Sequence, residues 1–190
     1  KEILFKVQYS NSNYQQTPEK KYWSGGIDLL HKWGSYKNIK YSLRHLNKFY
    51  LRQYIDRDVS LNTLEPCFFS DRNQSITLSN KITKRVWFNL GTGYLQRYYT
   101  KPFTEFDLDI IYLRGKLNYK ISNRCVTSLQ ANFGRASSES HLFPDRPSSF
   151  DRSYNTAEFY LPLKFRSNLS FIDEYGISYR SEHRLYDAED

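Results

Sequence analysis

The stretch from residue 75 to residue 99, SITLSNKITKRVWFNLGTGYLQRYY, decides the fold. Two runs of alternating apolar and polar residues flank a short turn at residues 82–85. The second run puts Val86, Phe88, Leu90, Thr92, Tyr94 and Tyr98 on one face and Asn89, Gly91, Gly93 and Arg97 on the other. Because successive side chains of a strand point to opposite faces, this pattern predicts an amphipathic antiparallel hairpin.

The same period of two recurs along the rest of the chain. We expect nine strands, at residues 2–10, 22–33, 39–55, the two limbs of the hairpin, 106–121, 125–134, 157–166 and 175–185. The apolar set of the sixth strand changes phase, which predicts a β-bulge near residues 113–115. Pro162 argues against the eighth strand, since proline cannot donate a ladder hydrogen bond.

The connections between these strands alternate in length. Loops expected at residues 11–21, 56–73, 99–105 and 137–154 are longer than the turns that follow the second, fourth, sixth and eighth strands. Outer-membrane barrels have this asymmetry, with tight periplasmic turns and longer outer loops. The sequence therefore predicts an all-β fold, an antiparallel up-and-down transmembrane β-barrel of about 8–10 strands or a large segment of one. A ninth strand lacks a visible partner, so we expect the single domain 1–190 to belong to a longer polypeptide.

Composition is compatible with such a barrel. The chain has 190 residues, of which 39% are hydrophobic and 17% aromatic, including 17 tyrosines. It contains no apolar run of about eighteen residues, as a transmembrane helix needs, whereas a barrel strand needs apolar side chains only at alternate positions. The net charge of +8 is spread one or two residues at a time. We therefore expect no nucleic-acid partner, and no motif indicates a cofactor.

Two features of the chain carry a resemblance to known proteins. They are repeated hairpins, such as Tyr-Lys-Ile-Ser-Asn-Arg at residues 119–124, and the loop-to-strand passage at residues 151–155. The chain resembles bacterial outer-membrane β-barrel proteins in general over nearly its full length. The resemblance implies the outer membrane of a Gram-negative envelope, with lipid, lipopolysaccharide and other envelope proteins as partners. The implied roles are pores, secretion, surface assembly and adhesion.

Basic residues on the polar faces of the strands are the candidate binding site. The third strand carries four of them on one face, and later strands add others: Lys40, Arg44, Lys48, Arg52, Arg97, Lys164, Arg166, Arg180 and Arg184. In a barrel this ladder is expected to line the lumen and to favour anionic cargo or lipopolysaccharide phosphates. Trp23 and Trp33, near opposite ends of one strand, suit two membrane-interface belts or a packed core.

Catalytic and metal-binding patterns are weak. Ser181 and His183 share a strand face, but no carboxylate is placed to orient the histidine, so we expect no enzyme. Asp107 and Asp109 are expected on the lumen face, where they balance the basic ladder or bind a cation.

Two further pairs of residues have a structural interpretation. Gly91 and Gly93 are expected to allow close packing in the lumen. Cys67 and Cys125 lack zinc-site spacing, and whether they pair is left open. The alternative to a membrane barrel is a soluble, aromatic-rich β-sandwich or barrel that binds an extended ligand such as a glycan.

Overall fold

The computed structural model describes residues 1–55, 64–101, 103–138, 153–166 and 174–187. It contains β1 (Glu2–Ser12), β2 (Tyr22–Gly34), β3 (Lys37–Ile55), β4 (Leu64–Lys81), β5 (Val86–Tyr99), β6 (Leu108–Lys120), β7 (Cys125–Ser138), β8 (Tyr154–Arg166) and β9 (Glu174–Tyr186). Two 3-10 helices, η1 (Pro18–Lys20) and η2 (Thr104–Phe106), follow β1 and β5. Residues 56–63, 139–152 and 167–173 of the expected loops lie outside the described residues, as does the start of the passage at 151–155.

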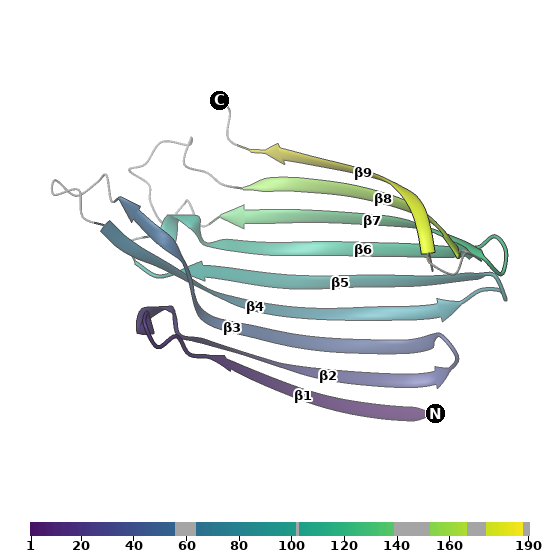
Figure 1. Cartoon of the computed structure of the whole chain (residues 1–190), viewed down its shortest axis with the longest axis horizontal. Helices are drawn as coiled ribbons and strands as arrows, with labels where there is room; N and C mark the ends of the chain where they lie inside the picture. The colour runs from purple at the N-terminus through teal and green to yellow at the C-terminus, as the bar shows by residue number, and fades with distance from the viewer. Residues whose placement is uncertain (56–63, 102, 139–152, 167–173, 188–190) are drawn as a thin grey trace.

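The nine strands form one sheet in the order of the sequence. Every neighbouring pair is antiparallel, so the predicted all-β, up-and-down arrangement is confirmed. β1 and β9 are the two edges, which lie far apart and run in the same direction (Figure 1). The sheet is therefore open, and the described chain does not close a barrel by itself. One sheet also excludes a β-sandwich built from these strands.

The two ends of the sheet differ in their connections. β2–β3, β4–β5 and β6–β7 are joined at one end by residues 35–36, 82–85 and 121–124. We call this the short-turn end. The connections through η1 and η2 lie at the opposite end, here called the long-loop end (Figure 1). The expected alternation of connection lengths is thus present among the five connections that the structure describes.

Two of the short turns are built in the same way. In the β4–β5 turn, the Thr83 Oγ1 accepts hydrogen bonds from the backbone N–H groups of Arg85 and Val86, at 3.2 and 3.0 Å. In the β6–β7 turn, the Ser122 Oγ accepts the equivalent bonds from Arg124 and Cys125, at 3.2 and 3.1 Å. A hydroxyl that bonds to the backbone two and three residues ahead favours a tight turn over further strand.

The expected loop at 56–73 is wrong for its second half, because β4 begins at Leu64. The backbone of this segment pairs with β3. The Phe68 ring contacts Tyr50 with 5.6 Å between ring centroids, and the Phe69 ring contacts Phe49 at 5.5 Å. Both phenylalanines are buried. Cross-strand aromatic pairing therefore makes a strand of residues that carry little alternation.

The predicted bulge at 113–115 is also wrong, because β6 keeps one register with β5 and with β7 over its whole length. Because the alternation is uninterrupted, Asp109 lies on the same face of the sheet as Leu113. Its Oδ1 accepts hydrogen bonds from the hydroxyls of Tyr94 and Tyr98, at 2.7 and 3.1 Å. Two tyrosine partners thus let a carboxylate take a position where the sequence pattern favours an apolar residue.

The structure has its register shifts elsewhere, one in the β2–β3 ladder between Lys32 and Gly34 and two in the β3–β4 ladder. The β3–β4 register shifts between Leu46 and Phe49 and again between Tyr50 and Arg52. Lys48 lies in the first of these β3–β4 shifts and has a φ of 51°, in the left-handed region. Phe49 therefore lies on the opposite face of the sheet from Ile39, where an uninterrupted alternation would put both residues on one face.

Pro162 lies inside β8, as the alternating pattern predicts. The β7–β8 ladder has no pairs at positions 161 and 162, yet its register is the same on both sides of this gap. The Thr127 Oγ1 donates a hydrogen bond to the Pro162 carbonyl at 2.8 Å, which ties the two strands together there. The missing proline N–H is accommodated without a bulge.

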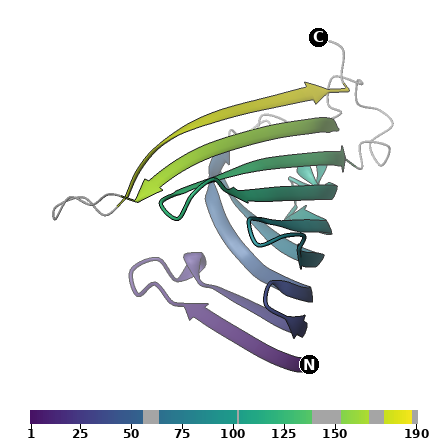
Figure 2. The ribbon, with the colours of Figure 1, turned by 90° about the vertical axis from the view of Figure 1, so that its right-hand side faces the viewer.

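The sheet curves into an open trough with a concave and a convex face (Figure 2). Alternate residues of β4 show the contrast: Asn73, Ser75, Thr77 and Ser79 are half-buried or buried, and Gln74, Ile76 and Leu78 are exposed. The less exposed set lines the concave face, where side chains converge. Across the sheet the convex positions are mostly apolar and the concave positions mostly polar.

Candidate functional site on the concave face

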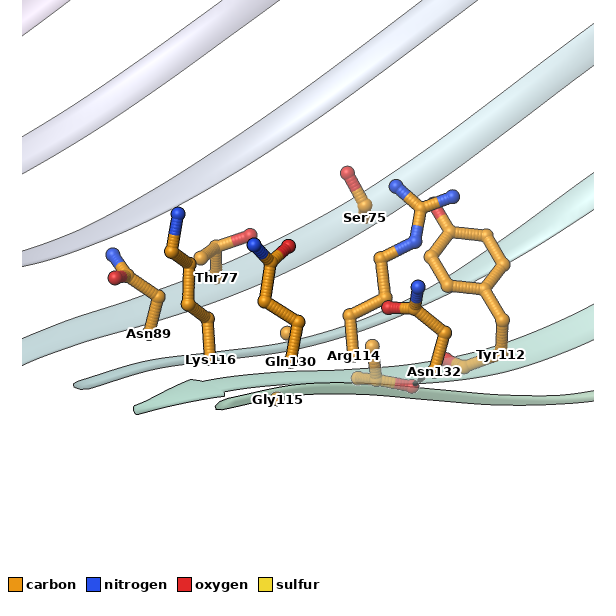
Figure 3. A pocket seen from close by; sticks show the side chains of 11 residues that line it. Ser75, Thr77, Asn89, Tyr112, Arg114, Gly115, Lys116, Gln130 and Asn132 are labelled. Carbon is orange, nitrogen blue, oxygen red and sulfur yellow. Dashed lines mark hydrogen bonds between the residues drawn. The ribbon is translucent and has the colours of Figure 1, made fainter. Parts of the chain in front are cut away.

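A hollow lies in the middle of the concave face, over β4 to β7. It has a volume of about 220 Å³. Its polar lining includes Ser75, Thr77, Asn89, Tyr112, Arg114, Lys116, Gln130 and Asn132. Figure 3 shows these side chains rising from one side of the sheet. The volume is below the range of about 300–1,000 Å³ usual for drug-sized ligands, so the hollow suits a small polar group.

The Tyr112 ring forms one wall of the hollow. A Cβ atom at Gly93 would overlap this ring, so the ring lies directly over the glycine on the neighbouring strand. The Tyr112 hydroxyl then donates to the Asn73 Oδ1 at 2.8 Å. Gly91 is similarly close to the Thr77 hydroxyl, where an added Cβ would lie 3.0 Å from Oγ1. The prediction that Gly91 and Gly93 allow close packing is confirmed, on the concave face.

Arg114 and Lys116 are the cations of the hollow. The Arg114 guanidinium lies 4.4 Å from the centre of the Tyr112 ring, a cation–π distance. In the described part of the chain, neither Arg114 nor Lys116 has a carboxylate within ion-pair distance. They are residues that the sequence-based prediction missed, because the expected bulge at 113–115 broke the alternation that places both beside Tyr112.

The first part of the predicted ladder is neutralised. Asp28 is buried on β2, where both of its carboxylate oxygens accept hydrogen bonds from the Arg44 Nη2, at 2.7 and 2.8 Å. The Lys40 Nζ lies 3.3 Å from the same carboxylate, and the Ser42 hydroxyl donates to it at 2.7 Å. Arg44 lies over Gly26, where a Cβ would come within 2.7 Å of its side chain. Lys40 and Arg44 thus form a compact charge cluster with Asp28.

Other predicted ladder residues form ion pairs of their own. Arg97 binds Asp71 through its Nε and Nη2, both at 2.9 Å. Arg180 contacts Glu158 at 2.7 Å, and Arg184 contacts Glu182 at 3.3 Å. Lys164 pairs with Glu174 at 2.8 Å near the sheet edge. The basic residues therefore alternate with carboxylates, and the expected continuous cationic ladder is divided into separate pairs.

The remaining ladder residues are Lys48, Arg52 and Arg166. Lys48 lies at the first β3 bulge, with its Nζ 5.1 Å from the centre of the Phe68 ring. Arg52 lies opposite Cys67 in the β3–β4 ladder, beyond the second bulge. Arg166 ends β8 and is exposed at the short-turn end. These three do not join the Asp28 cluster or the hollow.

The candidate catalytic and acidic residues lie elsewhere. Ser181 Oγ and His183 Nε2 are 3.0 Å apart on the convex face, and no carboxylate in the described residues lies within ion-pair distance of the histidine. Asp107 precedes β6 and accepts a hydrogen bond from the Tyr99 N–H at 2.6 Å. Asp109 is convex, so the prediction that both aspartates face the lumen and balance the basic ladder is wrong.

The cysteines and metal-ligating residues offer no second site. Cys67 is in β4 and Cys125 begins β7, and no disulfide joins them. Within the described ranges, no group of three or more His, Cys, Asp or Glu residues is arranged to hold a metal ion. The same ranges contain no helix long and apolar enough to cross a membrane. Comparison with protein-family models and with curated protein sequences found no match.

Proposed function

We propose that the chain forms part of the wall of an integral outer-membrane β-barrel that acts as a pore, an export conduit or a surface-assembly scaffold. One observation carries this proposal, namely that the polarity of the sheet is reversed relative to a water-soluble fold. Apolar side chains lie on the exposed convex face: Ile3 is 71% exposed, Phe5 67%, Ile111 63% and Ile177 73%. Charged and amide side chains instead gather on the concave face.

Water is a poor solvent for such a convex face. Soluble monomers rarely expose contiguous apolar patches larger than a few hundred Å². In the described residues no second layer covers the convex side, since all nine strands belong to one sheet. Lipid acyl chains would cover it, and the polar concave face would then line the interior, as in outer-membrane barrels.

The tryptophans of β2 support the same orientation. Trp23 and Trp33 both lie on the convex face at opposite ends of the strand. Ten residue steps of about 3.3 Å separate them by roughly 33 Å along the strand, which spans the hydrocarbon layer after tilting. Tryptophan favours membrane–water interfaces, so these residues suit two belts.

The proposal includes closure of the open sheet into a barrel. An open sheet edge in hydrocarbon would leave backbone N–H and C=O groups without hydrogen bonds. The β1 and β9 edges are therefore proposed to pair with further strands. The interior would carry polar or anionic cargo past Arg114 and Lys116, while lipid and lipopolysaccharide are the proposed surroundings.

Tryptophan quenching by brominated lipid tests the proposal. The chain is refolded into phosphatidylcholine vesicles whose acyl chains carry bromine. A W87F variant keeps the convex Trp23 and Trp33, and we expect strong quenching of its fluorescence.

The matched variant carries W23F and W33F and keeps Trp87, which lies on the concave face beside Tyr36, with ring centroids 5.8 Å apart. Its fluorescence should change little, because the interior excludes acyl chains. Equal quenching in both variants, or none in either, contradicts the proposed orientation.

A further inference from the structure

Among the described residues, cations outnumber carboxylates at the short-turn end. Its carboxylates among the described residues are Glu2 and Glu174, which pair with Lys32 at 3.6 Å and Lys164 at 2.8 Å. Several cations of this end have no carboxylate within ion-pair distance in the described chain. We call them the basic rim: Lys37, Lys81, Lys84, Arg85, Lys120 and Arg124.

Backbone hydrogen bonds hold this rim in a fixed arrangement. The Arg85 carbonyl accepts a hydrogen bond from the Lys120 N–H at 2.8 Å, which ties the β4–β5 turn to the end of β6. The Arg124 carbonyl accepts the equivalent bond from the Arg166 N–H at 2.8 Å. Each turn is thereby attached to the next hairpin, so the rim cations keep their spacing around the end of the sheet.

Aromatic side chains adjoin the rim at the same end. Trp33, Tyr119 and Tyr175 are convex residues with 39%, 44% and 58% of their surface exposed, and Tyr36 in the β2–β3 turn is 57% exposed. Amphipathic rings between an apolar band and a row of cations are typical of the lipid headgroup level. A nucleic acid or an acidic soluble protein would not explain the apolar band that continues from the rim.

We propose that the basic rim binds the headgroups of anionic phospholipids. The inference rests on the proposed membrane location. It goes further by naming the class of lipid that the chain binds at one side of the bilayer. Cations close to an anionic leaflet each contribute about 1 kcal/mol, which corresponds to roughly a fivefold change in binding. The rigid turns place several such cations side by side, so the preference for an anionic headgroup accumulates over the rim.

Lipid competition in detergent tests this inference. The full chain is refolded in a nonionic detergent and offered equal amounts of phosphatidylglycerol and phosphatidylcholine. The phospholipids that remain bound after gel filtration are quantified by mass spectrometry. We expect phosphatidylglycerol to be retained about tenfold over phosphatidylcholine at low salt. At about 1 M salt, where the Debye length is roughly 3 Å, the ratio should approach one.

A pair of double variants with the same charge change gives the control. K84E with R124E reverses two rim cations, and the ratio should fall at least about fivefold. K21E with K101E reverses two cations at the long-loop end and should leave the ratio within about twofold of the unmodified chain.

A ratio near one for the unmodified chain overturns the inference, as does an equal fall in both variants. If the rim variant does not fold, the salt titration of the unmodified chain tests the inference instead. A preference for phosphatidylglycerol that persists at about 1 M salt is not electrostatic and overturns it. Failure of the proposed function is seen separately, as loss of convex tryptophan quenching in neutral lipid.

Discussion

At the scale of single residues, the contact between Gly93 and Tyr112 supports the hollow. A methyl group at residue 93 would overlap the tyrosine ring and come within 2.8 Å of the Gln74 carbonyl oxygen. We expect G93A to lower the free energy of unfolding by about 1–3 kcal/mol, the usual cost of overpacking. Urea unfolding of the full chain in detergent micelles, followed by fluorescence, measures the change.

The control is G115A on the adjacent strand. The nearest atom to a Cβ at Gly115 is the Ala131 carbonyl oxygen at 3.9 Å, so the added methyl has space. Its effect should remain within about 0.5 kcal/mol. Similar losses in both variants would show that alanine destabilises these strands for a reason unrelated to Tyr112. That result would contradict the specific role of the Gly93–Tyr112 contact.

At the scale of elements, the turn hydroxyls explain why two hairpins form where they do. T83V keeps the branched shape of residue 83 but removes the acceptor for the Arg85 and Val86 N–H groups. We expect a loss of about 0.5–1.5 kcal/mol in the free energy of unfolding. T83S should retain nearly full stability, because Ser122 makes the same bonds in the β6–β7 turn. Equal stability of T83V and T83S in urea unfolding would contradict this assignment.

The strands show what alternation predicts and where it fails. The faces of β5 follow directly from the sequence, since five of the seven alternate positions from Val86 to Tyr98 are apolar or aromatic. The sequence predicts a phase change in β6 because its apolar residues pass from one alternate set, which includes Ile110 and Tyr112, to the other, which includes Leu113 and Leu117. The sequence alone does not show that Tyr94 and Tyr98 bind the Asp109 carboxylate. The left-handed backbone at Lys48 is equally invisible, because lysine has no special preference for it.

The candidate site depends on register between strands, which the alternation leaves undetermined. Arg44 is expected on a polar face, yet its pairing with Asp28 follows only from the β2–β3 register, which places Ser42 opposite Asp28 and Arg44 opposite Gly26. The basic residues were therefore found, while their neutralisation was not. Arg114 and Lys116 would have been found by continuing one alternation through β6 without a bulge.

At the scale of the whole molecule, the proposed lipid contact predicts opposite tolerance of charge on the two faces. L161K places a lysine in the middle of β8 on the convex face, where the leucine is 47% exposed. In a bilayer such a lysine costs about 2–4 kcal/mol near the midplane, whereas on a protein surface in water it costs little. S178K lies opposite Pro162 on the concave face and should change stability by less than about 0.5 kcal/mol.

Urea-dependent folding into phosphatidylcholine vesicles measures both variants against the unmodified chain. The comparison separates the two solvents of the convex face, because hydrocarbon predicts a loss for L161K alone, whereas water predicts almost no difference between L161K and S178K. A convex lysine that folds as well as the concave one would mean that water or another protein covers this face. A loss confined to L161K would instead require hydrocarbon there, since both lysines add the same charge to neighbouring strands.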